Sequence, residues 1–189
     1  MKIAILGWGS LIWSPTTLQY NKEIGWDKEG PKLPIEFSRI SQDGRLTLVL
    51  DKNADNVQTF FTTSSYQKLD EAVLNLAERE RCSTRKIGYY EKISGEFNPH
   101  DFLYKENIKE WMNSKDFDAA IWTNLGKKFK DEIGFSHNAE NVIKYLENLP
   151  EKVKNTAEEY IRKTPGNIKT PIRQVIIDRL KWTEVQLKP

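Results

Sequence analysis

The chain has 189 residues, and its 29 lysines and arginines nearly balance 27 aspartates and glutamates, which leaves a formal net charge of +2. That length is sufficient for one well-packed core, and the balanced charge excludes a strong field for nucleic acid or an anionic membrane. The single cysteine, Cys82, excludes an internal disulfide, and no apolar run reaches the roughly 20 residues that cross a bilayer. We therefore expect a cytoplasmic protein that binds a small molecule and neither nucleic acid nor a membrane.

The first part of the chain carries strand patterns. Lys2 to Leu6 is a short apolar run that ends at a glycine, which predicts a buried first strand. Ile35 to Ile40 and Arg45 to Leu50 alternate apolar and polar residues around Asp43-Gly44, a strong signal for an antiparallel hairpin. Val57 to Thr63 is predicted to add a third strand.

A helical period begins after Ser65. Leu69, Val73 and Leu76 are spaced four and then three residues apart, which predicts one apolar stripe on a helix that ends near Arg81. Ser65 is the expected N-cap of that helix, because a serine side chain can accept a hydrogen bond from an unpaired first-turn amide.

The rest of the chain adds two strands and several helices. Residues 87–90 and 119–123 are predicted strands, separated by a helix over about 100–113. Three amphipathic helices follow in the last third, and the last begins with Thr170 as N-cap before Pro171.

Together these elements predict an α+β fold with a largely antiparallel or mixed sheet, because hairpins dominate and no regular alternation of strand and helix occurs. We expect a single domain over residues 1–189, in which the helical part, 137–189, packs on the sheet.

A glycine-rich loop follows the first strand directly. Closely spaced backbone amides in such a loop can converge on a carboxylate or phosphate, although a tight turn that needs glycine explains the same residues. A dinucleotide-binding motif would need a third glycine at Ile12, and a P-loop would need a Gly-Lys-Ser/Thr ending, and the sequence has neither. The loop residues are Gly7, Trp8, Gly9, Ser10 and Leu11.

Glu80 extends the apolar stripe of the predicted helix by four residues, so its carboxylate faces the core side near the helix C-terminus. Such a group needs a cationic partner, or desolvation and the helix dipole raise its proton affinity. One interpretation is an ion pair with Arg79, Arg81 or Arg85. The other is a general base that works near neutral pH.

Both features resemble motifs of one enzyme superfamily. The run from Leu6 to Trp13 resembles the Tyr-Gly-Ser-Leu opening of the γ-glutamylcyclotransferases, with Trp8 at the position of the tyrosine. The run from Leu76 to Glu80 resembles the Leu-x-x-Arg-Glu helix of the glutathione-specific, ChaC-like branch.

The resemblance implies a γ-glutamylcyclotransferase-like fold, a mixed sheet or partial barrel with flanking helices. It implies an enzyme that cyclises a γ-glutamyl amide, such as glutathione, to 5-oxoproline and releases an amine. Backbone amides of Gly9, Ser10 and Leu11 would hold the substrate carboxylate, and Glu80 would transfer the proton, with no cofactor. The alternative is a non-catalytic protein of the same fold that binds small molecules or anions.

Other site types have less support in the sequence. Cys82 with His100 or His137 lies in no nucleophile signature. No pair of histidine and cysteine has zinc-ligand spacing, so we expect no metal site. A nucleic-acid-binding protein that uses the C-terminal helices would need an uninterrupted basic face, and acids balance the basic residues there.

Overall fold

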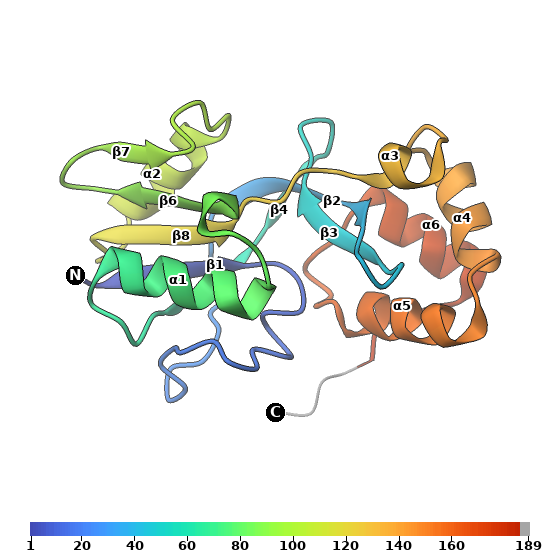
Figure 1. The fold of residues 1–189 in the computed structure, drawn as a ribbon, viewed down its shortest axis with the longest axis horizontal. Helices are drawn as coiled ribbons and strands as arrows, with labels where there is room; N and C mark the ends of the chain where they lie inside the picture. The colour runs from blue at the N-terminus through green and yellow to red at the C-terminus, as the bar shows by residue number, and fades with distance from the viewer. Residues whose placement is uncertain (186–189) are drawn as a thin grey trace. The chain divides into compact units, whose positions relative to one another are not determined.

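The computed structural model of the protein describes residues 1–185 and has an α+β fold. Within that range it contains six α-helices and two mostly antiparallel sheets (Figure 1). The chain forms two compact units. One comprises residues 1–33 and 58–125, and the other comprises residues 34–57 and the chain from Gly126 onward. They are called unit 1 and unit 2 below.

Unit 1 is built around a five-stranded sheet in the order β5-β1-β8-β6-β7. β1 runs parallel to β8, and the other neighbours are antiparallel. All five residues of β1 are buried, because neighbouring strands cover its edges and packed side chains cover its faces. The strands are β1 (Ile3–Gly7), β5 (Phe60–Thr63), β6 (Ile87–Glu91), β7 (Glu96–Asn98) and β8 (Ala119–Thr123).

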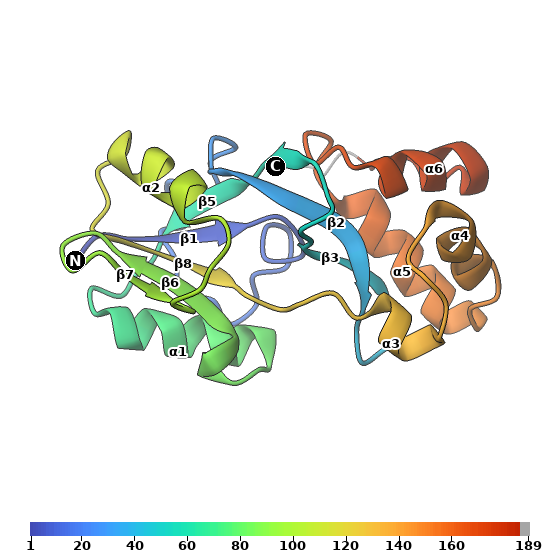
Figure 2. The same ribbon diagram turned by 90° about the horizontal axis from the view of Figure 1, so that it is seen from above.

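Two helices flank this sheet. α1 (Leu69–Glu80) packs against β8 and β6, and α2 (Lys105–Asn113) packs against β8 from the opposite face (Figure 2). The predicted stripe on α1 is confirmed, since Leu76 is fully buried and Leu69 and Val73 pack against the same core cluster. A 3-10 turn, η1 (Thr84–Lys86), connects α1 to β6.

The N-cap prediction for α1 was wrong. The cap position is Lys68, and no side-chain hydrogen bond caps the helix there. The amide of Ser65 instead donates to the carbonyl of Gln19 at 3.1 Å. That tertiary contact fixes the segment before the helix in a non-helical path, which a local capping pattern does not detect.

Unit 2 contains the predicted hairpin of β2 (Lys32–Ile40) with β3 (Leu46–Leu50), which is confirmed as antiparallel. The first two residues of β2 belong to unit 1. Ile35 pairs with Leu50 and Ile40 with Leu46, and a bulge interrupts the register between Phe37 and Arg39. Gly44 in the connecting turn has φ +82°, a backbone conformation that favours glycine.

The short strand β4 (Asn56–Gln58) completes a three-stranded sheet in the order β3-β2-β4. The prediction of one continuous strand from Val57 to Thr63 was therefore wrong. β4 and β5 are separated at Thr59, whose buried hydroxyl donates to the carbonyl of Pro31 at 2.6 Å, and they belong to different sheets.

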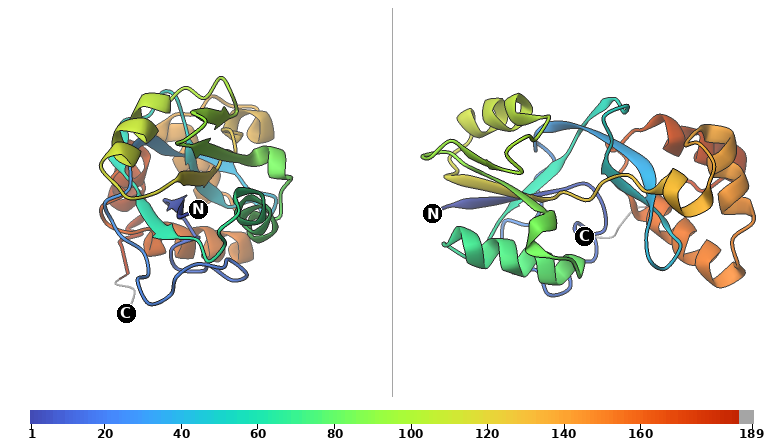
Figure 3. Two further views of the ribbon diagram at one scale, coloured as in Figure 1. Left: turned by 90° about the vertical axis from the view of Figure 1, so that its left-hand side faces the viewer. Right: turned by 45° about the horizontal axis from the view of Figure 1, so that its top comes forward.

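The four remaining helices lie in unit 2 (Figure 3). α5 packs against β3, and α4 packs against both α5 and α6. The predicted cap of α6 is confirmed, because the Thr170 side chain accepts a hydrogen bond from the Arg173 amide and Pro171 begins the helix. These helices are α3 (Phe129–Ile133), α4 (Ala139–Glu147), α5 (Glu151–Lys163) and α6 (Pro171–Leu180).

Neither sheet closes into a barrel within the described range. The sequence therefore predicted the α+β class and the antiparallel character correctly, whereas the γ-glutamylcyclotransferase-like fold and the single-domain organisation stay predictions.

Candidate functional site

The glycine loop leaves the end of β1 as a turn. The amide of Ile12 donates to the carbonyl of Gly9 at 3.0 Å, and the amide of Ser14 donates to the carbonyl of Ser10 at 2.8 Å. The loop is anchored by apolar packing, since Trp8 and Leu11 are each 6% exposed and Leu11 belongs to the core cluster of unit 1. Ser10 stays half-buried. Gly9 is buried as well, so Ser10 is the residue of this loop that keeps partial exposure.

Gly7 is required by packing. A Cβ atom on Gly7 would lie 2.7 Å from Cζ3 of the Trp26 ring, closer than carbon atoms approach without strain. Trp26 in turn contacts Tyr20, with 6.0 Å between the ring centroids. This close approach explains the first glycine of the loop without any ligand, as the tight-turn interpretation anticipated.

Glu80 is the last residue of α1, and it forms an ion pair with its neighbour. Nη1 of Arg79 lies 2.6 Å from Oε1 of Glu80. The two side chains are only 10% and 16% exposed, respectively. The ion-pair interpretation of Glu80 is therefore correct as a description of this contact, with Arg79 as the partner.

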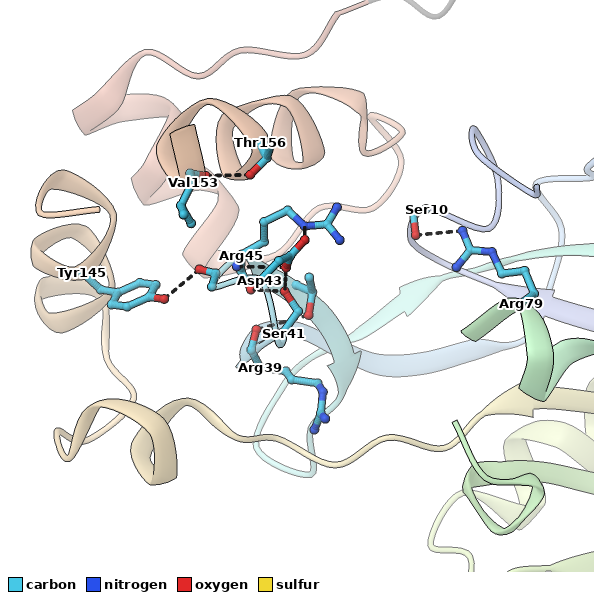
Figure 4. Close-up of polar contacts among 11 residues, drawn as sticks. Ser10, Arg39, Ser41, Asp43, Arg45, Arg79, Tyr145, Val153 and Thr156 are labelled. Carbon is cyan, nitrogen blue, oxygen red and sulfur yellow. Dashed lines mark hydrogen bonds and ion pairs between the residues drawn. The ribbon is translucent and has the colours of Figure 1, made fainter. Parts of the chain in front are cut away.

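The same guanidinium reaches the glycine loop. Nη2 of Arg79 donates to Oγ of Ser10 at 3.1 Å (Figure 4). The same nitrogen donates to the carbonyl of Ser14 at 2.7 Å. Arg79 therefore connects the Glu80 carboxylate to the loop that begins after β1. Nε of Arg79 is also buried and has no hydrogen-bond partner. Ser10 and Glu80 thus contact the same guanidinium group, which is largely shielded from solvent.

Burial raises the pKa of the Glu80 carboxyl group above its usual value, because desolvation disfavours the charged form. The charge of Arg79 and its hydrogen bond act in the opposite direction and offset only part of this increase. The carboxyl group also lies in the last turn of α1, where the helix dipole favours cations over anions. Glu80 thus holds its proton to a higher pH than an exposed glutamate.

The sequence analysis did not identify the polar residues of α1 that form hydrogen bonds with the segment after β1. Asn75 is buried, and its side chain accepts from the Gln19 amide at 2.8 Å and donates to the carbonyl of Thr17 at 3.1 Å. Asn75 and Arg79 are four residues apart, so they lie on the same face of the helix. In the sequence, the four-residue spacing of these two polar residues beside the apolar stripe could have indicated this role.

The other candidates of the sequence lie in different surroundings. Cys82 is half-buried and packs against the core of unit 1. His100 is exposed, and Nε2 of His137 lies 2.8 Å from the carbonyl of Phe37 within unit 2. Over residues 1–185 there is no group of three or more His, Cys, Asp or Glu residues that could hold a metal ion.

Among the helices described, none has the length and apolar character needed to cross a membrane. Comparisons of the chain with protein-family models, curated proteins and solved structures found no match.

Proposed function

We propose that the chain is a γ-glutamylcyclotransferase-like enzyme that cyclises a γ-glutamyl amide to 5-oxoproline and releases an amine. The observation that supports this most is the Arg79 guanidinium, which links the carboxylate of Glu80 to the Ser10 loop. A proton-transfer group and a candidate carboxylate-binding turn are thereby held by one side chain. The family fold, a small γ-glutamyl substrate such as glutathione and a cytoplasmic location belong to the same proposal.

The chemistry uses one proton-transfer group. The substrate's α-amino nitrogen attacks its own γ-carbonyl carbon, a new C–N bond closes the five-membered ring, and the original amide C–N bond breaks. Glu80 accepts the proton from the attacking nitrogen and returns it to the leaving amine, so no redox partner is needed. Its raised pKa supports this role, because a general acid and base works best with a pKa near the operating pH.

The substrate carboxylate would bind at the backbone amides of Gly9, Ser10 and Leu11. The hydrogen bonds within the turn are donated by Ile12 and Ser14, which lie after these three residues. The charge of Arg79, at hydrogen-bond distance from the Ser10 hydroxyl, makes this side of the loop more favourable for an anion.

A second function is favoured by the ion pair itself. A carboxylate that stays paired with a guanidinium at 2.6 Å is a weaker base than an unpaired one. In that case the loop and Arg79 would bind an anionic small molecule without turnover, as in the non-catalytic alternative.

The deciding experiment measures 5-oxoproline released from glutathione and from simple γ-glutamyl amides. The Glu80→Gln variant is expected to lose about 10² to 10⁴ in rate, the usual contribution of a general base. Glu78→Gln is the matched control, because Glu78 lies two residues earlier on the same helix and is exposed. Absence of product with the unsubstituted protein, together with calorimetric binding of 5-oxoproline, would favour the binding protein instead.

A further inference from the structure

Unit 2 contains a cavity of about 490 Å³ that is separate from the site around Glu80. A volume of this order is typical of small-molecule sites. Its wall includes Glu36 and Ser38 of β2, Asp51 just after β3, and Phe129 and His137 from the segment around α3. Lysines 127, 128 and 130 line the other part of the wall, together with the exposed aspartates 55 and 131.

Glu36 is an internal cap of a helix. The residue is 5% exposed, and its carboxylate accepts hydrogen bonds from the Phe37 amide at 2.7 Å, the Ile172 amide at 3.2 Å and the Thr170 hydroxyl. The Glu36 carboxylate therefore already supplies the negative charge that the N-terminus of α6 favours. A ligand anion would have to compete with Glu36 for this helix terminus.

Asp51 offers a buried carboxylate to the cavity. Its side chain is 3% exposed, and it accepts from the Asn53 amide at 3.1 Å and from Nζ of Lys127 at 3.3 Å. Burial opposes its ionisation, but the hydrogen bond from the Asn53 amide, the nearby Ser38 hydroxyl and the charge of Lys127 outweigh burial and lower its pKa. Asp51 is therefore negatively charged at neutral pH.

Ser38 is a second polar group on the same wall. The residue is completely buried, and its Oγ has no hydrogen bond of good geometry, although it lies near enough to Asp51 to favour the charged carboxylate. A buried hydroxyl in that state has unused hydrogen-bonding capacity, which a bound polar group can satisfy.

The chemistry of these buried groups selects a ligand. The carboxyl groups of Glu36 and Asp51 and the hydroxyl of Ser38 can accept hydrogen bonds. Asp51 already accepts one from an ammonium group, that of Lys127. Lys127 is 45% exposed, so water can solvate it when another ammonium replaces it. An ammonium ligand is thus favoured over phosphate for the buried wall.

The lysines on the other part of the wall favour a negatively charged group on the ligand. The three lysines outnumber the two exposed aspartates on this part of the wall and disfavour a simple cation, and Lys130 forms no ion pair within the described residues. A ligand with an ammonium at one end and a carboxylate at the other matches both walls. We propose that this cavity is a binding site for a free amino acid, with its ammonium at Asp51 and Ser38 and its carboxylate at the lysines.

The test begins with the unsubstituted protein. Each of the twenty common L-amino acids is added at millimolar concentration in a thermal-unfolding assay, and any that raises the midpoint is titrated by calorimetry. The corresponding N-acetyl amino acid, which lacks the ammonium, is expected not to bind, and the decarboxylated amine is expected to bind more weakly. The proposal is overturned if none of the twenty binds, or if the N-acetyl compound binds equally well.

Variants then locate the ligand. Asp51→Asn keeps an oxygen for the Asn53 amide but removes the charge, and it is expected to weaken binding by about tenfold to a hundredfold. Asp178→Asn, the same change on the exposed part of α6, should bind like the unsubstituted protein. Equal affinities of the Asp51 and Asp178 variants would place the ligand elsewhere. The outcome is independent of 5-oxoproline production, because Glu80 belongs to unit 1.

Discussion

Gly7 lies against the indole of Trp26 so closely that a methyl group at Gly7 would come within 2.7 Å of the ring. Gly7→Ala is expected to destabilise the protein by about 1–3 kcal/mol, as overpacking in a filled core does. Urea unfolding measures this change. Gly126→Ala is the control, because a Cβ atom there has nothing within 4 Å.

A double-mutant cycle tests the cause of that effect. In a Trp26→Leu background, Gly7→Ala should cost clearly less, since the clashing ring is absent. An unchanged cost in that background would show that the glycine is required for another reason, such as the backbone of the loop.

Arg79→Met is expected to lower the free energy of unfolding by about 1.5–3 kcal/mol, the range for hydrogen bonds to charged groups. The substitution removes the contacts to Ser10 and Ser14 and leaves the Glu80 carboxyl group without its cation. Chemical denaturation measures the loss. Arg85→Met, at an exposed position, serves as the control, and equal stabilities of the two variants would contradict the connecting role of Arg79.

Ser10→Ala separates the side chain of the loop from its backbone. The variant loses the hydrogen bond from Arg79, so a cost of about 1 kcal/mol in stability is expected. Its backbone amide survives, so the affinity for 5-oxoproline should change little. Gly9→Val should instead weaken binding, because a β-branched side chain crowds the backbone where the ligand approaches. Calorimetric titration of both variants provides the comparison, and normal binding by a folded Gly9→Val protein would make the loop purely structural.

Glu36 gives the stability of the protein a definite pH dependence. Burial raises its pKa above the ordinary value, despite the hydrogen bonds from Thr170, Phe37 and Ile172 and the nearby His137. Between the unfolded and folded pKa values the folded state binds more protons, so this contribution to stability is present at low pH and lost as pH rises through the folded pKa.

Glu36→Gln removes that titration. Urea unfolding between pH 4 and pH 8 should therefore show the unsubstituted protein losing stability relative to the variant as pH increases. Glu147→Gln, which changes an exposed glutamate of the same unit, should follow the unsubstituted protein. Parallel profiles for Glu36→Gln and the unsubstituted protein would contradict a raised pKa.

The predictions from sequence succeeded where the decisive interactions are local. The hairpin follows from Asp43-Gly44 between alternating runs, and the start of α6 follows from Thr170 before Pro171. They failed where contacts between segments far apart in the sequence determine the local structure. Ser65 is fixed by Gln19 instead of capping α1, and the strand after Val57 divides at a threonine bonded to Pro31.

The candidate sites show the same division. Glu80 could be selected from its place on a helical stripe, but its partner Arg79 was one of three arginines that sequence could not distinguish, because the contacts to Ser10 and Ser14 depend on the fold. The cavity beside Glu36 was not anticipated, since four separate segments form its wall, namely β2, the turn after β3, the segment around α3 and the start of α6.

The assignment of the chain to its two units changes at residues 33/34, 57/58 and 125/126, so neither unit is one continuous stretch of sequence. A truncation at Gly126 would remove the helices that cover the β2–β3 hairpin while leaving the hairpin attached to the remaining fragment. The apolar face of that hairpin would then be exposed to solvent and prone to aggregation. Separate production of unit 1 therefore requires a redesigned connection, such as a short linker that joins Leu33 directly to Gln58.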